Sequence, residues 1–142
     1  NMRMEMVEGS NGERIINDAY NASPTAMRAA IELVSELTGF ERKFLVLGDM
    51  LELGEEERDF HYSIGEFING EAIDKLYTYG RLGEDIEEGA KGKLGEENVH
   101  AYQDKDQLIN DLKKEAAEGD LVLVKASRGM KLEEVVYALQ KK

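Results

Sequence analysis

The residues best suited to ligand chemistry fall in three short polar stretches that lie far apart in the chain. Residues 17–24 read NDAYNASP, residues 48–54 read GDMLELG and residues 125–131 read KASRGMK. The first stretch carries one acid, two amides and a phenol, the second two acids, and the third three cations. Together they offer acceptors for a sugar or an amine and cations for an anionic group.

The third stretch has the strongest anion-binding chemistry. Arg128 can hold a carboxylate or phosphate through two parallel hydrogen bonds, and Lys125 and Ser127 add further donors. The net charge of the chain is -12, so an anionic ligand needs a local basic cluster of this kind. A solvated basic turn is the structural alternative.

The first stretch suits a nucleotide. Asp18 follows a predicted strand, where a carboxylate commonly accepts hydrogen bonds from a ribose diol. Asn17 and Asn21 can bond donors or acceptors, and Tyr20 adds a hydroxyl. An Asx-turn that leads into a capped helix would explain the same residue types without a ligand.

The acids of the second stretch have two interpretations. Asp49 and Glu52 can position a metal or an amine, or they can form a turn and complement the next helix dipole. The stretch lacks the lysine and Ser/Thr of a phosphate loop. His61 can shuttle protons, bind a nucleotide, or hold the preceding acidic turn. Because His61 and His100 stand apart without a supporting cluster, we predict no metal site.

An alternation of strands and helices has to bring these stretches together. The strand predicted at 43–48 has four consecutive apolar residues at 44–47, and the one at 121–124 is apolar throughout; such runs are typical of strands covered on both faces. We predict further strands at 3–8, 14–19, 75–79 and 99–102, and helices near 23–38, 55–68, 82–95, 104–116 and 132–139. The fold class is therefore α/β: a Rossmann-like, mostly parallel sheet with helices on both faces and an antiparallel N-terminal edge strand. Since parallel strands end at one edge, the three stretches should meet there.

The composition excludes several classes of protein. A length of 142 residues suits a single domain over residues 1–142. The absence of cysteine excludes disulfides and thiolate chemistry. The acidic balance argues against nucleic-acid partners, and no apolar run approaches the roughly 20 residues needed for membrane insertion. We predict a cytoplasmic protein.

The three stretches, in their order and spacing, resemble the Mur ligase family, in particular the ligases that add D-alanyl-D-alanine. The resemblance lies in NDAYNASP followed by Met27, in VLGDMLELG followed by His61, and in GD…VKASRGM between residues 119 and 130. It spans nearly the whole chain. Ala126 stands where the family often has glycine, and Ser23 where it commonly has asparagine, and we expect both to be tolerated.

The resemblance implies the C-terminal domain of a three-domain, ATP-dependent ligase. The sequence contains no GxGK[ST] phosphate loop, so the N-terminal UDP-binding and central ATPase domains would lie outside this chain, which alone would be inactive. The implied cofactors are ATP and Mg²⁺, the latter bound mainly by the central domain. The implied partners are D-alanyl-D-alanine, UDP-N-acetylmuramoyl-tripeptide and the rest of the same polypeptide, with an acyl phosphate as intermediate.

The resemblance also implies roles for individual residues. ATP binding falls to Asn17, Asp18, Tyr20 and Asn21, and substrate binding to Lys125, Ser127, Arg128, Asp49, Glu52 and His61. No residue of this chain is assigned a certain catalytic role. Two alternatives stay open: the corresponding domain of another Mur ligase or a folylpolyglutamate synthase, and a free-standing α/β binding module.

Overall fold

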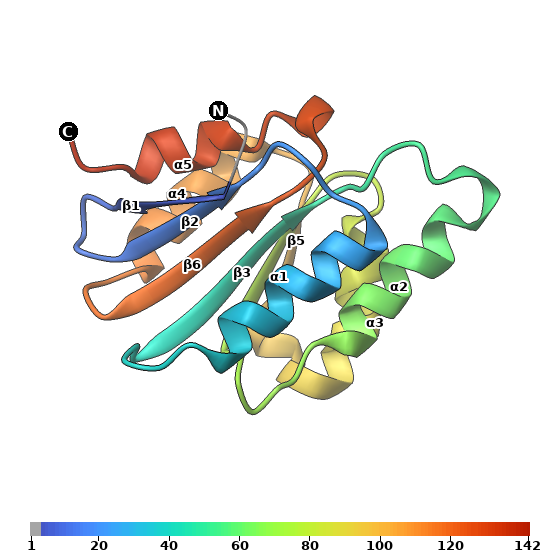
Figure 1. Cartoon of the computed structure of the whole chain (residues 1–142), viewed down its shortest axis with the longest axis horizontal. Helices are drawn as coiled ribbons and strands as arrows, with labels where there is room; N and C mark the ends of the chain where they lie inside the picture. Colours follow the sequence, from blue (N-terminus) through green and yellow to red (C-terminus); the bar gives the residue numbers. More distant parts are fainter. Residues whose placement is uncertain (1–3) are drawn as a thin grey trace.

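A six-stranded sheet forms the centre of the computed structural model, which describes residues 4–142. Its strands are β1 (Glu5–Glu8), β2 (Arg14–Asp18), β3 (Arg42–Gly48), β4 (Lys75–Tyr79), β5 (Val99–Tyr102) and β6 (Asp120–Lys125). Their order across the sheet is β1-β2-β6-β3-β4-β5, with β1 antiparallel to β2 and all other neighbours parallel (Figure 1). The order places the last strand of the chain between β2 and β3.

Helices cover both faces of this sheet, which confirms the predicted α/β class (Figure 1). One face carries α1 (Pro24–Glu36), α2 (Glu57–Phe67) and α3 (Gly83–Leu94), and the other carries α4 (Lys105–Glu115) and α5 (Glu133–Leu139). Short 3-10 turns are η1 (Gly54–Glu56), η2 (Glu96–Asn98) and η3 (Arg128–Met130). Among residues 4–142, no helix has the length and apolarity needed to cross a bilayer.

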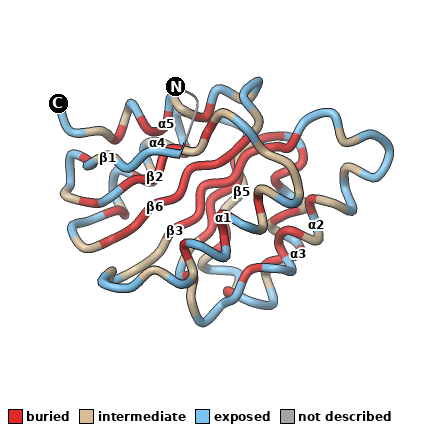
Figure 2. The backbone as a smooth tube through the Cα atoms, viewed as in Figure 1, coloured by how far each residue is buried: buried red, intermediate tan, exposed pale blue. Residues whose placement is uncertain are grey.

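The core consists of two apolar layers separated by the sheet. Leu121 and Leu123 of β6 pack toward α1, α2 and α3, whereas Val122 and Val124 pack toward α4 and α5. All four side chains are fully buried, and the buried stretches of β6 and β3 run through the middle of the molecule (Figure 2). This burial on both faces explains why the two strands are continuously apolar in sequence.

The helix boundaries follow the capping residues in the sequence. Ser23 accepts a hydrogen bond from the N–H of Ala26 at 3.1 Å, and Pro24 occupies the first helical position of α1. Asp104 accepts hydrogen bonds from the first turn of α4. The helix predicted from residue 55 begins as η1 and becomes α2 at Glu57. The predicted start of β1 at Arg3 lies outside the described residues.

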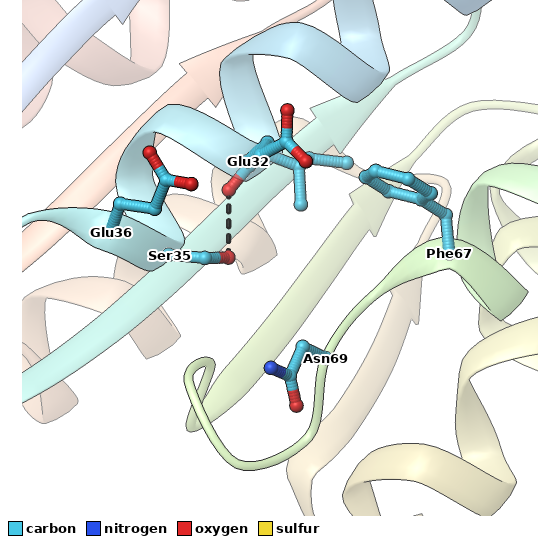
Figure 3. A pocket seen from close by; sticks show the side chains of 6 residues that line it. Glu32, Ser35, Glu36, Phe67 and Asn69 are labelled. Carbon is cyan, nitrogen blue, oxygen red and sulfur yellow. Dashed lines mark hydrogen bonds between the residues drawn. The ribbon is translucent and has the colours of Figure 1, made fainter.

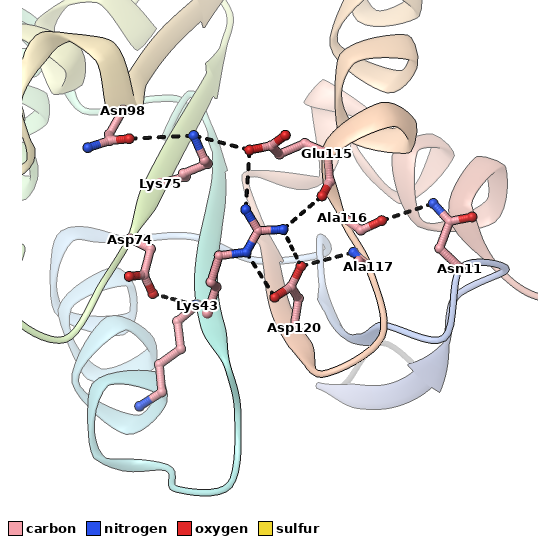
Figure 4. Close-up of polar contacts among 10 residues, drawn as sticks. Asn11, Lys43, Asp74, Lys75, Asn98, Glu115, Ala116, Ala117 and Asp120 are labelled. Carbon is pink, nitrogen blue, oxygen red and sulfur yellow. Dashed lines mark hydrogen bonds and ion pairs between the residues drawn. The ribbon is translucent and has the colours of Figure 1, made fainter.

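A polar network ties the amino ends of β3 and β6 together (Figure 4). The Arg42 guanidinium donates to both carboxylate oxygens of Asp120, at 3.1 and 2.8 Å, and to Glu115 at 3.2 Å. These hydrogen bonds, first of all that to Asp120, raise the pKa of Arg42 above its usual value. Lys75 reaches the same Glu115 carboxylate at 3.2 Å. The network lies at the opposite end of the strands from the three polar stretches and is part of the scaffold.

The helix predicted at 82–95, which its internal glycines would weaken, is a continuous helix over Gly83–Leu94, and one of these glycines makes a close contact with α2. A methyl group on Gly89 would overlap the carbonyl oxygen of Tyr62 in α2, and one on Gly65 would overlap the carbonyl oxygen of Ile86 in α3. Both glycines are buried. The two helices therefore touch backbone to backbone, which residues with side chains would prevent.

This contact predicts that Gly89→Ala destabilises the chain although alanine favours helices. We expect the free energy of unfolding to fall by about 1–3 kcal/mol, since overpacking outweighs the gain in helix propensity. Gly92→Ala is the matched control: apart from its chain neighbours and the nearby backbone of its own helix, no atom lies within 4 Å of the added methyl, so stability should rise by roughly 0.5–1 kcal/mol. Urea denaturation measures both; equal effects of the two variants would contradict the prediction.

Candidate functional site

A pocket of about 340 Å³ opens where the loops after β2, β3 and β6 meet. Its lining comes from all three polar stretches: Tyr20, Asn21, Ala22, Leu51, Glu52, Ser127, Arg128 and Gly129. The three strands are neighbours in the sheet and the loops follow their carboxyl ends (Figure 1). The expectation that the stretches converge at one edge of the sheet is therefore confirmed.

An ion pair joins the first and third stretches beneath this pocket. The Lys125 ammonium lies 2.6 Å from a carboxylate oxygen of Asp18 and donates to the carbonyl oxygen of Asn21 at 2.9 Å. The Lys125 side chain is 4% exposed and that of Asp18 14%. Lys125 thus neutralises the acid and holds the loop that leads into α1, rather than lying on the pocket surface.

Asn17 and Tyr20 form the other support of the first loop. Asn17 is fully buried, and its side-chain oxygen accepts a hydrogen bond from the N–H of Ala19 at 3.3 Å, which gives the Asx-turn that was the alternative to ligand binding. The Tyr20 hydroxyl lies 3.1 Å from that of Tyr137 in α5. Tyr20 therefore lines the pocket while its hydroxyl is held from outside the three stretches.

Two hydrogen bonds join the second and third loops. The N–H of Ser127 donates to the carbonyl oxygen of Asp49 at 3.1 Å, and the N–H of Leu51 donates to the Ser127 hydroxyl at 2.9 Å. Arg128 follows directly and is exposed at the pocket. Within residues 4–142, its guanidinium makes no ion pair and no side-chain hydrogen bond. A rigid backbone thus presents a cation that is available to an anionic ligand.

His61 holds the second loop from below. Its Nε2 accepts a hydrogen bond from the N–H of Met50 at 2.9 Å, and its Nδ1 lies 2.6 Å from the carbonyl oxygen of Glu57. Only a neutral ring with its proton on Nδ1 satisfies both contacts. The side chain is fully buried and does not line the pocket. The structure therefore agrees with the interpretation of His61 as a support for the acidic turn.

The two acids of the second stretch occupy different environments. Asp49 is 4% exposed and accepts a hydrogen bond from the N–H of Leu82 at 3.1 Å, where α3 begins. Burial raises the pKa of the Asp49 carboxyl, and the hydrogen bond to Leu82 acts in the opposite direction. Glu52 is exposed, lines the pocket and has a left-handed backbone with φ 63°. Only Glu52 can meet a ligand directly in this arrangement.

A second hollow of about 350 Å³ lies near the carboxyl ends of α1 and α2 and has the wrong electrostatics for an anion (Figure 3). Glu32 and Glu36 line it together with Phe67 and Asn69. Carboxylates and the carbonyl ends of helices both repel negative charge. The pocket beside Arg128 is the better candidate for a carboxylate or a phosphate.

The pocket offers groups for only part of a nucleotide. Within residues 4–142, no group of three or more His, Cys, Asp or Glu side chains is close enough to share a cation. Tyr20 and Asn21 offer a phenol and an amide to a ligand, and the Asp18 carboxylate lies just behind them. An open pocket of this volume takes one end of a large ligand and leaves the remainder uncovered.

Two residues of the site are absent from our sequence-based assignment, for different reasons. Leu51 contributes an apolar wall to the pocket, and Tyr137 holds Tyr20 although 117 positions separate them in sequence. Leu51 lies inside a stretch that we singled out only for its acids. No local spacing could connect Tyr137 with the first loop, because only the packing of α5 beside β2 brings them together.

Comparisons with known proteins agree with the pattern of the three stretches. A sequence profile of the family described as "Mur ligase, glutamate ligase domain" matches residues 2–128. The UDP-N-acetylmuramoyl-tripeptide--D-alanyl-D-alanine ligase of Bacillus subtilis (strain 168) is 52% identical over 138 residues, covering 97% of this chain and 30% of the relative. The enzyme of the same name from Escherichia coli (strain K12) is 36% identical, covering 97% and 29%.

The fold comparison agrees as well. The crystal structure of MurF ligase from Thermotoga maritima in complex with ADP matches with a TM-score of 0.79 at 33% sequence identity, covering 96% of this chain and 30% of that chain. The chain therefore spans about 30% of the length of the relatives that it matches.

The raised pKa of Asp49 predicts a specific pH dependence of stability. Folding favours the protonated form of this carboxyl. The contribution of Asp49 to the free energy of unfolding is therefore fully present below its ordinary pKa of 3.8, and it declines as the pH rises through the folded-state pKa. The side-chain amide of an Asp49→Asn variant keeps the acceptor for Leu82 but cannot ionise. The unfolding free energy of the wild type minus that of the variant should therefore fall as the pH rises above about 3.8 and through the folded-state pKa.

Urea denaturation across this pH range measures that difference. Glu118→Gln, at an exposed carboxylate in the turn before β6, serves as the control and should show a much smaller trend. A wild type that gains stability over Asp49→Asn as the pH rises would reverse the sign and refute the argument.

Proposed function

This chain belongs to the Mur ligase family, and we propose that it is the C-terminal domain of an ATP-dependent ligase that adds D-alanyl-D-alanine to UDP-N-acetylmuramoyl-tripeptide in peptidoglycan synthesis. The names of the Bacillus subtilis and Escherichia coli relatives support this substrate pair. The UDP-binding and phosphate-loop domains would belong to the rest of the polypeptide. The ligase would work in the cytoplasm, where ATP is available.

The observation that carries the proposal is the exposed Arg128 guanidinium, which lines the pocket formed by the loops after β2, β3 and β6. A dipeptide has a carboxylate at one end and an amine at the other. Arg128, with the neighbouring Ser127 hydroxyl, offers donors for the carboxylate, while Glu52, which lines the same pocket, offers an acceptor for the amine. Asp49 and His61 would act indirectly, by fixing the backbone that carries Glu52 and Leu51.

The first loop would contact ATP. We assign the direct contacts to Tyr20 and Asn21, which line the pocket, and a supporting role to Asp18, Asn17 and Lys125, which lie behind them. The relative from Thermotoga maritima crystallised with ADP supports an adenine nucleotide as substrate. We assign the magnesium ion of the reaction mainly to the central domain, which would carry the phosphate loop.

The proposed reaction gives this domain a role distinct from that of the phosphate-loop domain. ATP would phosphorylate the terminal carboxylate of the tripeptide, and the dipeptide amine would then attack the acyl phosphate, forming the amide and releasing phosphate. The amine has to be oriented beside the activated carbonyl while water is excluded. A domain that binds the dipeptide and closes over the nucleotide supplies both conditions, because closure assembles the site only when the substrates are present.

Arg128→Ala in the complete ligase tests the assignment. Loss of a charge-assisted contact should weaken binding of D-alanyl-D-alanine by about 1.5–3 kcal/mol, or roughly one to two orders of magnitude in KM. Steady-state kinetics with varied dipeptide measure the change. Arg58→Ala is the matched control, because Arg58 is an exposed arginine of α2 that pairs with Asp85 outside the pocket. If KM and kcat stay at wild-type values, Arg128 is not part of the site.

The choice of acceptor separates the proposal from its alternatives. We expect the complete ligase to join D-alanyl-D-alanine to the tripeptide and to reject glutamate and diaminopimelate, which other ligases of this superfamily use. The preference is measured as the rate of amide formation with each acceptor, monitored through the release of ADP. Preference for glutamate or diaminopimelate would assign the chain to another branch, and the absence of any ATP-dependent ligation would favour the free-standing binding module.

A further inference from the structure

The turn that carries Arg128 needs support at its far end. In η3, the N–H of Met130 bonds to the carbonyl of Ser127 and the N–H of Lys131 to that of Arg128, both at 3.0 Å. Lys131 then takes a left-handed backbone with φ 54°, which a residue with a side chain adopts at a cost. A turn of one helical repeat followed by such a residue keeps its shape only if other groups hold it.

Lys105, the first residue of α4, provides that support. Its ammonium donates to the carbonyl oxygens of Met130 and Lys131, each at 3.1 Å, and to the Glu134 carboxylate at 2.8 Å. The Lys105 side chain is only 16% exposed, and its ammonium lies 5.2 Å from the centre of the Tyr79 ring. All three N–H groups are used, and the aromatic face adds a favourable cation–π contact.

The arrangement gives Arg128 two anchors. On its N-terminal side, Ser127 is joined to the Asp49 and Leu51 backbone, and on its C-terminal side Lys105 holds the last carbonyls of η3. The ammonium suits those carbonyls because they form the negative end of a short helical turn. Lys105 also lowers the pKa of Glu134, so this carboxylate stays ionised and continues to hold the ammonium.

Packing of α4 does not require this lysine. Leu108 and Leu112 of α4 are fully buried in the core, and Asp104 caps its first turn. The Lys105 ammonium, by contrast, reaches across to η3 and α5. The contact therefore fixes the turn rather than the helix.

We propose that Lys105 is a positioning residue of the ligase, which acts by holding the η3 turn so that Arg128 faces the dipeptide pocket. We call the three hydrogen bonds of the Lys105 ammonium to Met130, Lys131 and Glu134 the clamp. The role of Lys105 in the reaction rests on the proposed function, whereas the clamp rests on these contacts alone. Lys105 lies outside the three polar stretches, so neither their spacing nor their order indicates it.

The first measurement addresses the clamp. Lys105→Met keeps an unbranched apolar stem over Tyr79 but removes the donors. In the complete ligase, we expect amide hydrogen exchange to accelerate in a peptide that covers residues 128–134, while exchange in β6 and the core of α4 stays as in the wild type. Lys114→Met, at an exposed lysine of the same helix, should leave exchange at 128–134 unchanged. Unchanged exchange in Lys105→Met would overturn the clamp.

The second measurement addresses the reaction. Misplacement of Arg128 should raise the KM for D-alanyl-D-alanine by roughly tenfold, up to about 100-fold, with little change in the KM for ATP. Lys105→Arg, which keeps the charge and the donors, should restore part of the loss. A merely structural role would instead lower kcat through loss of folded enzyme and leave both KM values unchanged.

A double variant separates these cases. If Lys105 acts through Arg128, adding Lys105→Met to Arg128→Ala should change the dipeptide KM by less than about twofold, because the group being positioned is already absent. Equal effects of Lys105→Met in both backgrounds, or an unchanged dipeptide KM in an active enzyme, would overturn the positioning role. A wild-type ligase without activity toward D-alanyl-D-alanine would reject the proposed function and the role in catalysis, while the exchange data would still decide the clamp.

Discussion

β6 pairs in parallel with β2 along one side and with β3 along the other, and its side chains are buried on both faces of the sheet. This double pairing makes neighbours of three strand ends, although Asp18 at the end of β2 and Lys125 at the end of β6 lie 107 positions apart in the chain. A one-residue slip of β6 against both neighbours would turn Leu121 and Leu123 to the wrong helical layer and move Lys125 away from Asp18. The geometry of the pocket therefore depends on the same hydrophobic packing that stabilises the sheet.

Polar contacts beneath the pocket divide its residues into two groups. Lys125, Asn17, His61 and Asp49 use their side chains on neighbouring loops and are buried. Arg128 and Glu52 are exposed at the pocket and make no ion pair within residues 4–142. Buried polar groups in a medium of low dielectric need internal partners, whereas exposed ones can exchange water for a ligand. The same motif thus contains both the support of the site and its contact surface.

The order of strands and helices, the caps at Ser23 and Asp104, and the meeting of the three loops were predictable from the sequence. Apolar periodicity and capping chemistry act over a few residues, so they can be recognised without a structure. The division of the motif residues was not predictable. Lys125 and Arg128 have the same charge and are three positions apart, yet one is buried against Asp18 and the other is exposed. Contacts from distant elements, such as Tyr137 on Tyr20, had no sequence signal at all.

The sequence by itself determined the α/β class, the Mur ligase resemblance and the identity of the loops that form the site, because these depend on local pattern and on motifs in a set order. Only the tertiary structure decided which side chains of the three stretches face the pocket. It alone revealed the hydrogen bonds from Lys105 to the carbonyl oxygens that follow Arg128. The physical reason is that the direction of a side chain depends on partners contributed by other elements. Those partners are adjacent in space only after β6 has entered the sheet between β2 and β3.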